Sequence, residues 1–263
     1  MQRASTIDRY PIAPEQIPER ELSASRYLVR FARSPEELDE ILRLRFEVFN
    51  LEMGEGLDSS FETGRDQDEF DAVCHHLMVI ERETDRVVGS YRVQTWEMAR
   101  DNLGFYSATE FDLQALPPSI RDHSVEIGRA CVAKTHRSTR VLFQLWKGLA
   151  LYVTSNAKRY VFGCASLTSQ DPHEGKALMD FFEREGHLHP DLTVHPQPGL
   201  ECYDAGFQAR SDATPELPML LRTYLRHGAK VCGPPAVDRL FKTIDYFVVI
   251  DAATMSQRDA FFE

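Results

Sequence analysis

The sequence is poor in cysteine and has no long apolar run, and each absence excludes a class of protein. The cysteines are odd in number, widely spaced and without a CxxC pair: Cys74, Cys131, Cys164, Cys202 and Cys232. This pattern predicts neither a disulfide framework nor a zinc ribbon, and it fits a reducing cytoplasm. The most apolar stretch, 141–154, is broken by Gln144 and Lys147 and is too short to span a bilayer.

The N-terminal segment also lacks the apolar core of a signal peptide. A cytoplasmic location is therefore expected, and peripheral association with the inner membrane stays open.

Basic residues are outnumbered, with 30 Lys and Arg against 41 Asp and Glu, a formal net charge of −11. A general nucleic-acid partner is not expected, because such a protein needs a basic face to displace counterions. A calcium loop beginning at Asp66 would need a glycine and a glutamate where Asp71 and Leu77 stand. We therefore predict no metal site and no bound cofactor.

The 263 residues suit one large domain, and no internal repeat or clear linker is visible. Residues 1–24 contain three prolines and no periodicity, which predicts a loose N-terminal arm. Residues 25–263 are then a single domain, with a His-, Pro- and Gly-rich insertion at about 187–215.

Strand and helix patterns alternate along this domain. Ser34 and Pro35 mark a helix start, and Ser138 or Thr139 is expected to cap a second helix. The predicted strands are 27–32, 76–81, 86–95, 125–132, 160–166 and 246–251, and further helices are expected at 171–185 and 217–226. This order predicts an α/β fold around a mixed sheet flanked by helices.

The segment 124–146 (SVEIGRACVAKTHRSTRVLFQLW) has a strand, a basic loop and an amphipathic helix in succession. It resembles the central unit of the GNAT superfamily of acyltransferases, and within it the bacterial ornithine lipid N-acyltransferases, sometimes labelled hemolysin-like. Those enzymes are related to acyl-homoserine lactone synthases and N-acyl amino acid synthases. Further blocks that are similar to this family are 43–53, 66–71, 88–92, 104–112, 166–172 and 225–232.

The resemblance implies a GNAT fold with a splayed central sheet, and an acyl carrier protein as acyl donor. Acetyl-CoA-dependent relatives have a glycine-rich loop between the central strand and helix, whereas residues 136–140 (HRSTR) contain no glycine. Glycine there lets backbone N–H groups approach a pyrophosphate, which a carrier-protein phosphopantetheine lacks. The loop thus favours acyl carrier protein, while acyl-CoA stays open as the donor.

The resemblance also points to the catalytic residues. Glu126 is the candidate general base, and Arg129 would bind a substrate carboxylate or orient Glu126. Three residues apart on a regular strand, they would lie on opposite faces, so they can share a site only if a β-bulge near Gly128 re-aims one of them. The alternative is a plain Glu–Arg pair at a sheet edge.

Backbone N–H groups of Cys131 and Val132 are candidates to stabilise the thioester oxygen. Cys131 as a nucleophile is the alternative, and direct transfer is preferred because it is usual in the family. Arg137 and Arg140, at the start of the next helix, are candidates to bind the phosphopantetheine phosphate. The alternative for both arginines is a solvated surface position.

Asp68, Asp71 and Ser166 are assigned to acceptor binding, since carboxylates could receive the cationic side chain of ornithine. The alternative for the acidic residues is a solvated loop. Taken together, the sequence predicts transfer of a long-chain, 3-hydroxylated or unsubstituted acyl group to the α-amine of ornithine. Other acceptors such as glycine, acyl-homoserine lactone synthesis and a non-enzymatic hemolysin-like protein stay as alternatives.

Overall fold

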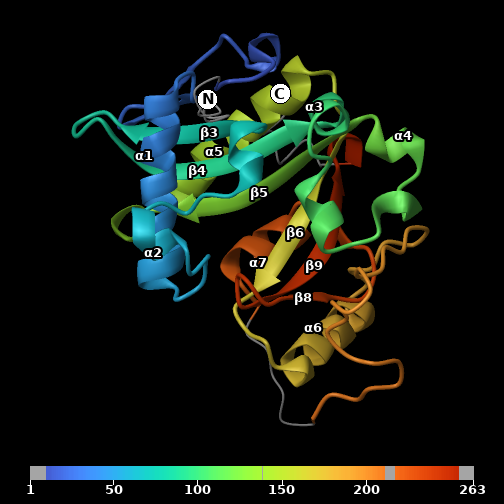
Figure 1. Ribbon diagram of the computed structural model, residues 1–263. Coiled ribbons are helices and arrows are strands. Elements are labelled where there is room, and N and C mark those ends of the chain that lie inside the picture. Colours follow the sequence, from blue (N-terminus) through green and yellow to red (C-terminus); the bar gives the residue numbers. More distant parts are fainter. Residues whose placement is uncertain (1–9, 138, 211–216, 255–263) are drawn as a thin grey trace, which may run out of the picture. The chain divides into compact units, whose positions relative to one another are not determined.

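The computed structural model describes residues 10–137, 139–210 and 217–254, and the chain divides into two compact units (Figure 1). Among the described residues the first unit comprises 10–104 and 125–158, and the second comprises 105–124 and 159–254. The expected helix cap at Ser138 and the end of the expected insertion, 211–215, lie outside the described residues, as does the side chain of Thr139.

The first unit is built on five antiparallel strands paired in chain order: β1 (Leu22–Ser23), β2 (Tyr27–Phe31), β3 (His75–Glu81), β4 (Arg86–Thr95) and β5 (Ser124–Val132). Two long helices, α1 (Pro35–Arg45) and α5 (Thr139–Ser155), cover its two faces. Met78 of β3 packs in the cluster of α1, while the neighbouring Leu77 lies against Gly148 of α5. Alternation along β3 thus buries both faces of this sheet.

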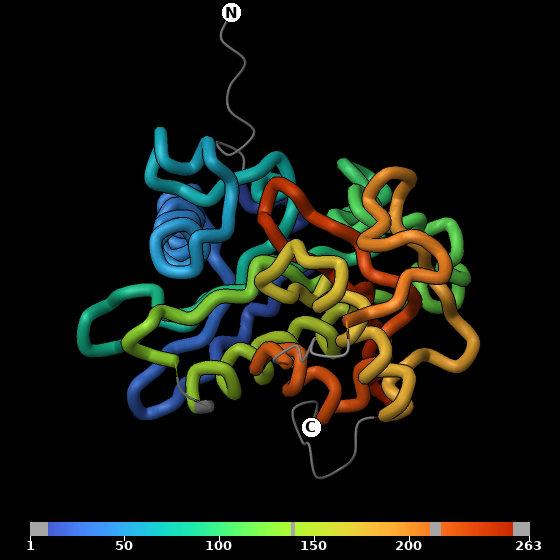
Figure 2. Tube along the Cα trace, turned by 90° about the horizontal axis from the view of Figure 1, so that it is seen from below, coloured from blue at the N-terminus to red at the C-terminus, as the bar shows by residue number. Residues whose placement is uncertain are grey.

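Helix α1 begins as its sequence predicts. The Ser34 hydroxyl accepts a hydrogen bond from the Glu37 N–H at 3.3 Å, and Pro35 occupies the first helical position. Beyond Arg45 the chain continues in a π-helical segment, η3 (Phe46–Glu52), and then in α2 (Ser60–Thr63) and η4 (Glu69–Ala72). The segment between α1 and η4 therefore folds back beside α1 (Figure 2), where the Asp66 N–H donates to the Leu42 carbonyl at 3.1 Å.

Residues 10–24 differ from the loose arm that the prolines suggested. Tyr10 and Ile17 are buried, and the Tyr10 hydroxyl donates to the Ala32 carbonyl at 3.3 Å. Strand β1 pairs with β2, so two apolar side chains and a strand hold this segment on the first unit.

The second unit is built around the pairing of β6 (Tyr160–Leu167) with β9 (Thr243–Asp251), which runs without a break from Tyr160↔Asp251 to Leu167↔Ile244. Two short strands, β7 (Lys230–Val231) and β8 (Ala236–Asp238), also pair with β9. Its helices are α4 (Pro118–Arg121), α6 (Pro172–Arg184) and α7 (Met219–Arg226). The described part of the insertion, 187–210, is irregular apart from isolated bridges.

The remaining helical segments are short. They are α3 (Trp96–Asp101) and the 3₁₀ turns η2 (Pro14–Gln16), η5 (Tyr106–Thr109), η6 (Leu113–Ala115), η7 (Lys134–His136) and η8 (Ala252–Thr254). Among the described residues, no helix is long and apolar enough to cross a membrane.

Candidate active site

Strand β5 contains a bulge at the position where the site prediction needed one. Its pairing with β4 passes from Arg92↔Gly128 to Ser90↔Cys131, so two residues of β5 face one residue of β4. Arg129, within this bulge, has φ of 49°, in the left-handed region that non-glycine residues rarely adopt. The strand therefore contains the bulge near Gly128 that a site shared by Glu126 and Arg129 requires.

The bulge brings the side chains of Glu126 and Arg129 to one face of the sheet. Gln94 lies opposite Glu126 and donates from Nε2 to its Oε2 at 2.6 Å. Arg92, two residues before Gln94 and so on the same face, donates to Asp68 Oδ1 at 2.6 Å. Arg129 donates to the other oxygen of Asp68 at 2.7 Å. Only 5% of Glu126 is exposed, so this is a shielded position.

A network of buried ion pairs supports this face. Arg45, at the end of α1 and 0% exposed, donates to Asp66 Oδ1 at 2.8 Å and to Asp71 Oδ1 at 2.6 Å. Arg92 also reaches Asp71 Oδ1, at 3.1 Å. We call this set the arginine–aspartate network; its members are Arg45, Arg92, Arg129, Asp66, Asp68 and Asp71. Its three positive and three negative charges balance, as burial requires.

The aspartates are placed by the local fold of their own segment. Asp68 caps η4 by accepting from the Phe70 N–H at 2.9 Å, and Asp71 accepts from the Asp68 N–H at 2.8 Å. These reciprocal bonds form a capping box. The Phe70 ring also carries the Arg92 guanidinium, 5.6 Å from its centroid. Hydrogen bonds within residues 68–71 thus hold the two carboxylates in position to contact the arginines.

The network fixes the ionisation of its members. Burial alone would raise the pKa of Asp68, but the Arg92 and Arg129 guanidinium groups outweigh burial and hold this pKa well below its usual range. Burial likewise raises the pKa of Asp71, but the charges of Arg45 and Arg92 lower it by more, so the net shift of this pKa is downward. Both aspartates are therefore anionic at neutral pH, and arginines already match their charge. Their predicted role in holding an acceptor cation stays a prediction.

Cys131 is buried, and burial raises the pKa of its thiol to about 12. A nucleophilic thiolate is thus disfavoured at neutral pH. Val132 follows it opposite Gly89, and the predicted role of the two N–H groups stays a prediction.

The remaining predicted residues lie in two places. Arg137 follows η7 and is ion-paired with Glu52, its two terminal nitrogens donating at 2.6 and 2.9 Å. Arg140 is exposed in the first turn of α5. Ser166 belongs to the second unit, where it pairs with Asp245 across β6 and β9. The arginine–aspartate network and Glu126 lie in the first unit.

Sequence reasoning missed the supporting residues Arg45, Asp66, Arg92 and Gln94. The sequence of β4 contains a signal for two of them. The polar residues Ser90, Arg92 and Gln94 alternate with Tyr91 and Val93. A polar stripe on a strand that is buried on both faces indicates partners in the interior.

Comparison with known proteins identifies the family of this chain. Residues 44–147 match the model of the acetyltransferase (GNAT) domain, so the protein is an N-acyltransferase of the GNAT class. The L-ornithine N(alpha)-acyltransferase of Brucella abortus (strain 2308) is 32% identical over 243 residues, covering 88% of this chain and 86% of that protein. Its counterpart from Rhodobacter capsulatus is 32% identical over 248 residues, covering 88% and 92%. The chain belongs to this acyltransferase family.

Among solved structures, the AHL synthase LasI aligns with a TM-score of 0.49 at 14% identity, over 90% of this chain and 95% of that one. The mixed α/β architecture and the match to the acetyltransferase (GNAT) domain model confirm the predicted α/β fold of the GNAT type.

Proposed function

We propose that this enzyme transfers a long-chain acyl group, 3-hydroxylated or unsubstituted, from acyl carrier protein to the α-amine of ornithine, giving lyso-ornithine lipid. One observation supports the proposal. The bulge of β5 turns the Arg129 side chain to the same buried face of the sheet as the Glu126 side chain. The family supports the acceptor, since the two relatives compared above are named for acylation of ornithine.

Glu126 is the general base of this reaction, directly or through water. It takes a proton from the α-ammonium group, and the amine nitrogen then attacks the thioester carbonyl. A C–N bond forms, the C–S bond breaks, and the phosphopantetheine sulfur leaves with a proton that Glu126 returns. The hydrogen bond from Gln94 holds the Glu126 carboxylate in orientation.

Arg129 is proposed to orient the acceptor by binding its carboxylate. Asp68 holds that guanidinium, and Arg92 holds Asp68 from the other side. The arginine–aspartate network is therefore a positioning device for Arg129, and the backbone N–H groups at Cys131 and Val132 would stabilise the oxyanion.

The donor is proposed to bind at the start of α5. The loop before this helix has no glycine, which suits a phosphopantetheine bearing one phosphate. Arg140 is exposed there, and Arg137 would exchange its pairing with Glu52 for the phosphate. Acyl-CoA is the alternative donor. We place the reaction in the cytoplasm, with peripheral membrane association to deliver the lipid product.

The test is an assay of purified protein with 3-hydroxyacyl and unsubstituted acyl donors, on carrier protein and on CoA. Ornithine, lysine, glycine and S-adenosylmethionine are offered in parallel, and N-acyl products are measured by mass spectrometry. We expect acylornithine from the carrier protein. If only glycine or only S-adenosylmethionine gives a product, that compound is the acceptor instead of ornithine. If no acceptor gives a product, the proposed acyltransferase activity is wrong.

Glu126→Gln tests the base. Glutamine can still accept the bond from Gln94, so the fold is kept while the rate falls by roughly 10²- to 10⁴-fold. Glu83→Gln, in the exposed turn between β3 and β4, is the matched control and should keep full activity. Lysis of liposomes by the protein alone, unchanged in Glu126→Gln, would favour the non-enzymatic alternative.

A further inference from the structure

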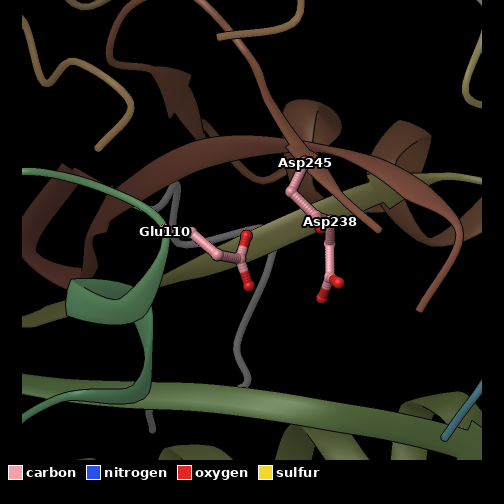
Figure 3. Close-up of side chains that lie close together, drawn as sticks. All are labelled: Glu110, Asp238 and Asp245. Atoms are coloured by element: carbon pink, nitrogen blue, oxygen red, sulfur yellow. The ribbon is translucent and has the colours of Figure 1, made fainter. Parts of the chain in front are cut away.

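Three carboxyl groups converge in the second unit, outside the face described above. Glu110 follows η5, Asp238 ends β8, and Asp245 lies on β9. One oxygen of each lies within 4.8 Å of the others. Asp238 pairs with Thr243, two residues before Asp245, so both aspartates project from one face of the β8–β9 ladder. Glu110 reaches toward them from its own segment (Figure 3).

Glu110 and Asp245 of this cluster are buried, Asp238 is half-buried, and no positive charge among the described residues matches them. Glu110 is 4% exposed and Asp245 is 3% exposed. Neither Glu110 Oε2 nor Asp245 Oδ1 has a hydrogen-bond partner among the described residues. None of the three carboxylates forms an ion pair with Lys, Arg or His in the described part of the chain. Uncompensated buried carboxylates are costly, which calls for a cation or a proton.

The protein holds the aspartates by their other oxygens. The Thr243 hydroxyl donates to Asp245 Oδ2 at 3.0 Å. The Leu240 and Phe241 N–H groups donate to Asp238 Oδ1 at 2.7 and 2.9 Å. The segment of Glu110 is fixed by the Gln197 N–H, which bonds the Glu110 carbonyl at 2.7 Å. One oxygen of each aspartate is thus anchored, and the second is left for a ligand.

A shared proton can satisfy two carboxyl groups, and burial favours it by raising the pKa of Asp245 to about 6 and that of Glu110 well above its usual range. With the proton shared by Glu110 and Asp245, Asp238 stays charged with only two backbone N–H partners among the described residues, whereas one divalent ion would engage all three carboxylates. Oxygen donors of this kind suit hard cations. We propose that Glu110, Asp238 and Asp245 bind one divalent cation of the Mg²⁺, Ca²⁺ or Mn²⁺ class. No sequence motif indicates this site, because Glu110 is distant from both aspartates along the chain.

The test uses the full-length protein after treatment with a chelator. Calorimetry with MgCl₂, CaCl₂ and MnCl₂, each alone, should show saturable binding of one ion per chain, and the unfolding temperature should rise with ion concentration. Asp245→Asn should abolish binding. Asp238→Asn, whose amide oxygen can still accept from the Leu240 and Phe241 N–H groups, should weaken it at least tenfold. The exposed Asp191→Asn is the matched control and should bind like the parent protein.

Two outcomes would overturn the proposal. The first is absence of saturable binding by all three ions at millimolar concentration, with Glu110→Gln raising the unfolding temperature of the metal-free protein; the cluster then only shares a proton. The second is binding that persists unchanged in Asp245→Asn, which would place the ion elsewhere. Since thermal unfolding reports on folding in each variant, loss of binding in a misfolded protein is recognised directly.

Discussion

At the residue scale, one guanidinium keeps two carboxylates in the interior of the first unit. Arg45 is fully buried against Asp66 and Asp71. Removing one member of a buried ion pair leaves an uncompensated charge, so Arg45→Met should lower the free energy of unfolding by about 3–5 kcal/mol. Urea unfolding measures this loss.

Arg43→Met is the matched control for that prediction. Arg43 lies on the same helix, but its pair with Asp39 is largely exposed, with 57% of the arginine side chain in solvent. Exposed pairs contribute little, so the loss should stay below about 1 kcal/mol. Equal losses in the two variants would contradict the structural importance of the buried network.

Also at the residue scale, the buried His75 and His76 should make the folded protein less stable at acid pH. Burial lowers the pKa of each imidazole from 6.5 to about 4. The unfolded chain therefore binds more protons between about pH 4 and 6.5, and stability present above pH 6.5 is lost as the pH falls through this window. At pH 5 each histidine should cost about 2 kcal/mol. Unfolding in urea at pH 8, 6 and 5 measures the slope.

The variant His75→Gln isolates one of the two histidines. Glutamine can donate to the Ile12 carbonyl and accept from the Tyr152 hydroxyl, as the His75 ring does at 2.7 and 2.8 Å. Its slope between pH 6.5 and 5 should be roughly half that of the parent protein. A slope that does not change in this variant would show that His75 is not the group that titrates.

At the scale of elements, the bulge of β5 determines what the strand can do. Arg129 has φ of 49°, a conformation that glycine adopts without strain and that costs energy for any residue with a Cβ, alanine included. Both Arg129→Gly and Arg129→Ala remove the bond to Asp68, so their difference reports the backbone alone. The glycine variant should be more stable by about 1 kcal/mol, and both should lose more than tenfold in kcat/KM. The opposite order of stability would indicate a regular strand.

The start of α5 is the element proposed to bind the donor phosphate. Arg140→Ala and Arg137→Ala should each raise the KM for the acyl donor several-fold and leave kcat unchanged, because uniform binding is lost. Glu52→Gln should have the opposite effect, since it releases Arg137 from its ion pair. Steady-state kinetics with acyl carrier protein measure all three. A KM that is the same in every variant would move the donor to another surface.

Local patterns were sufficient for most elements and insufficient for contacts distant in sequence. The caps of α1 and the β3–β4 hairpin follow from neighbouring residues, and the spacing of Glu126 and Arg129 required the bulge. The pairing of Arg45 with Asp66 and Asp71 depends on how the segment between them folds back on α1. No sequence periodicity predicts this long-range pairing. The burial of Tyr10 is also a long-range contact, and the prolines around it predicted a loose arm instead.

At the scale of the whole molecule, the burial of the cysteines disfavours a covalent acyl-cysteine intermediate. Four of the five cysteines are buried, Cys164 is half-buried, and none forms a disulfide. Burial raises the pKa of Cys131, Cys202 and Cys232 to about 12, so little thiolate exists at pH 8. A thiol reagent at pH 8 should therefore label at most Cys164 in the folded protein and all five cysteines in urea.

Mixing the enzyme with acyl donor alone should leave its intact mass unchanged. A mass increase by one acyl group, removed by hydroxylamine, would contradict direct transfer and make a cysteine the nucleophile.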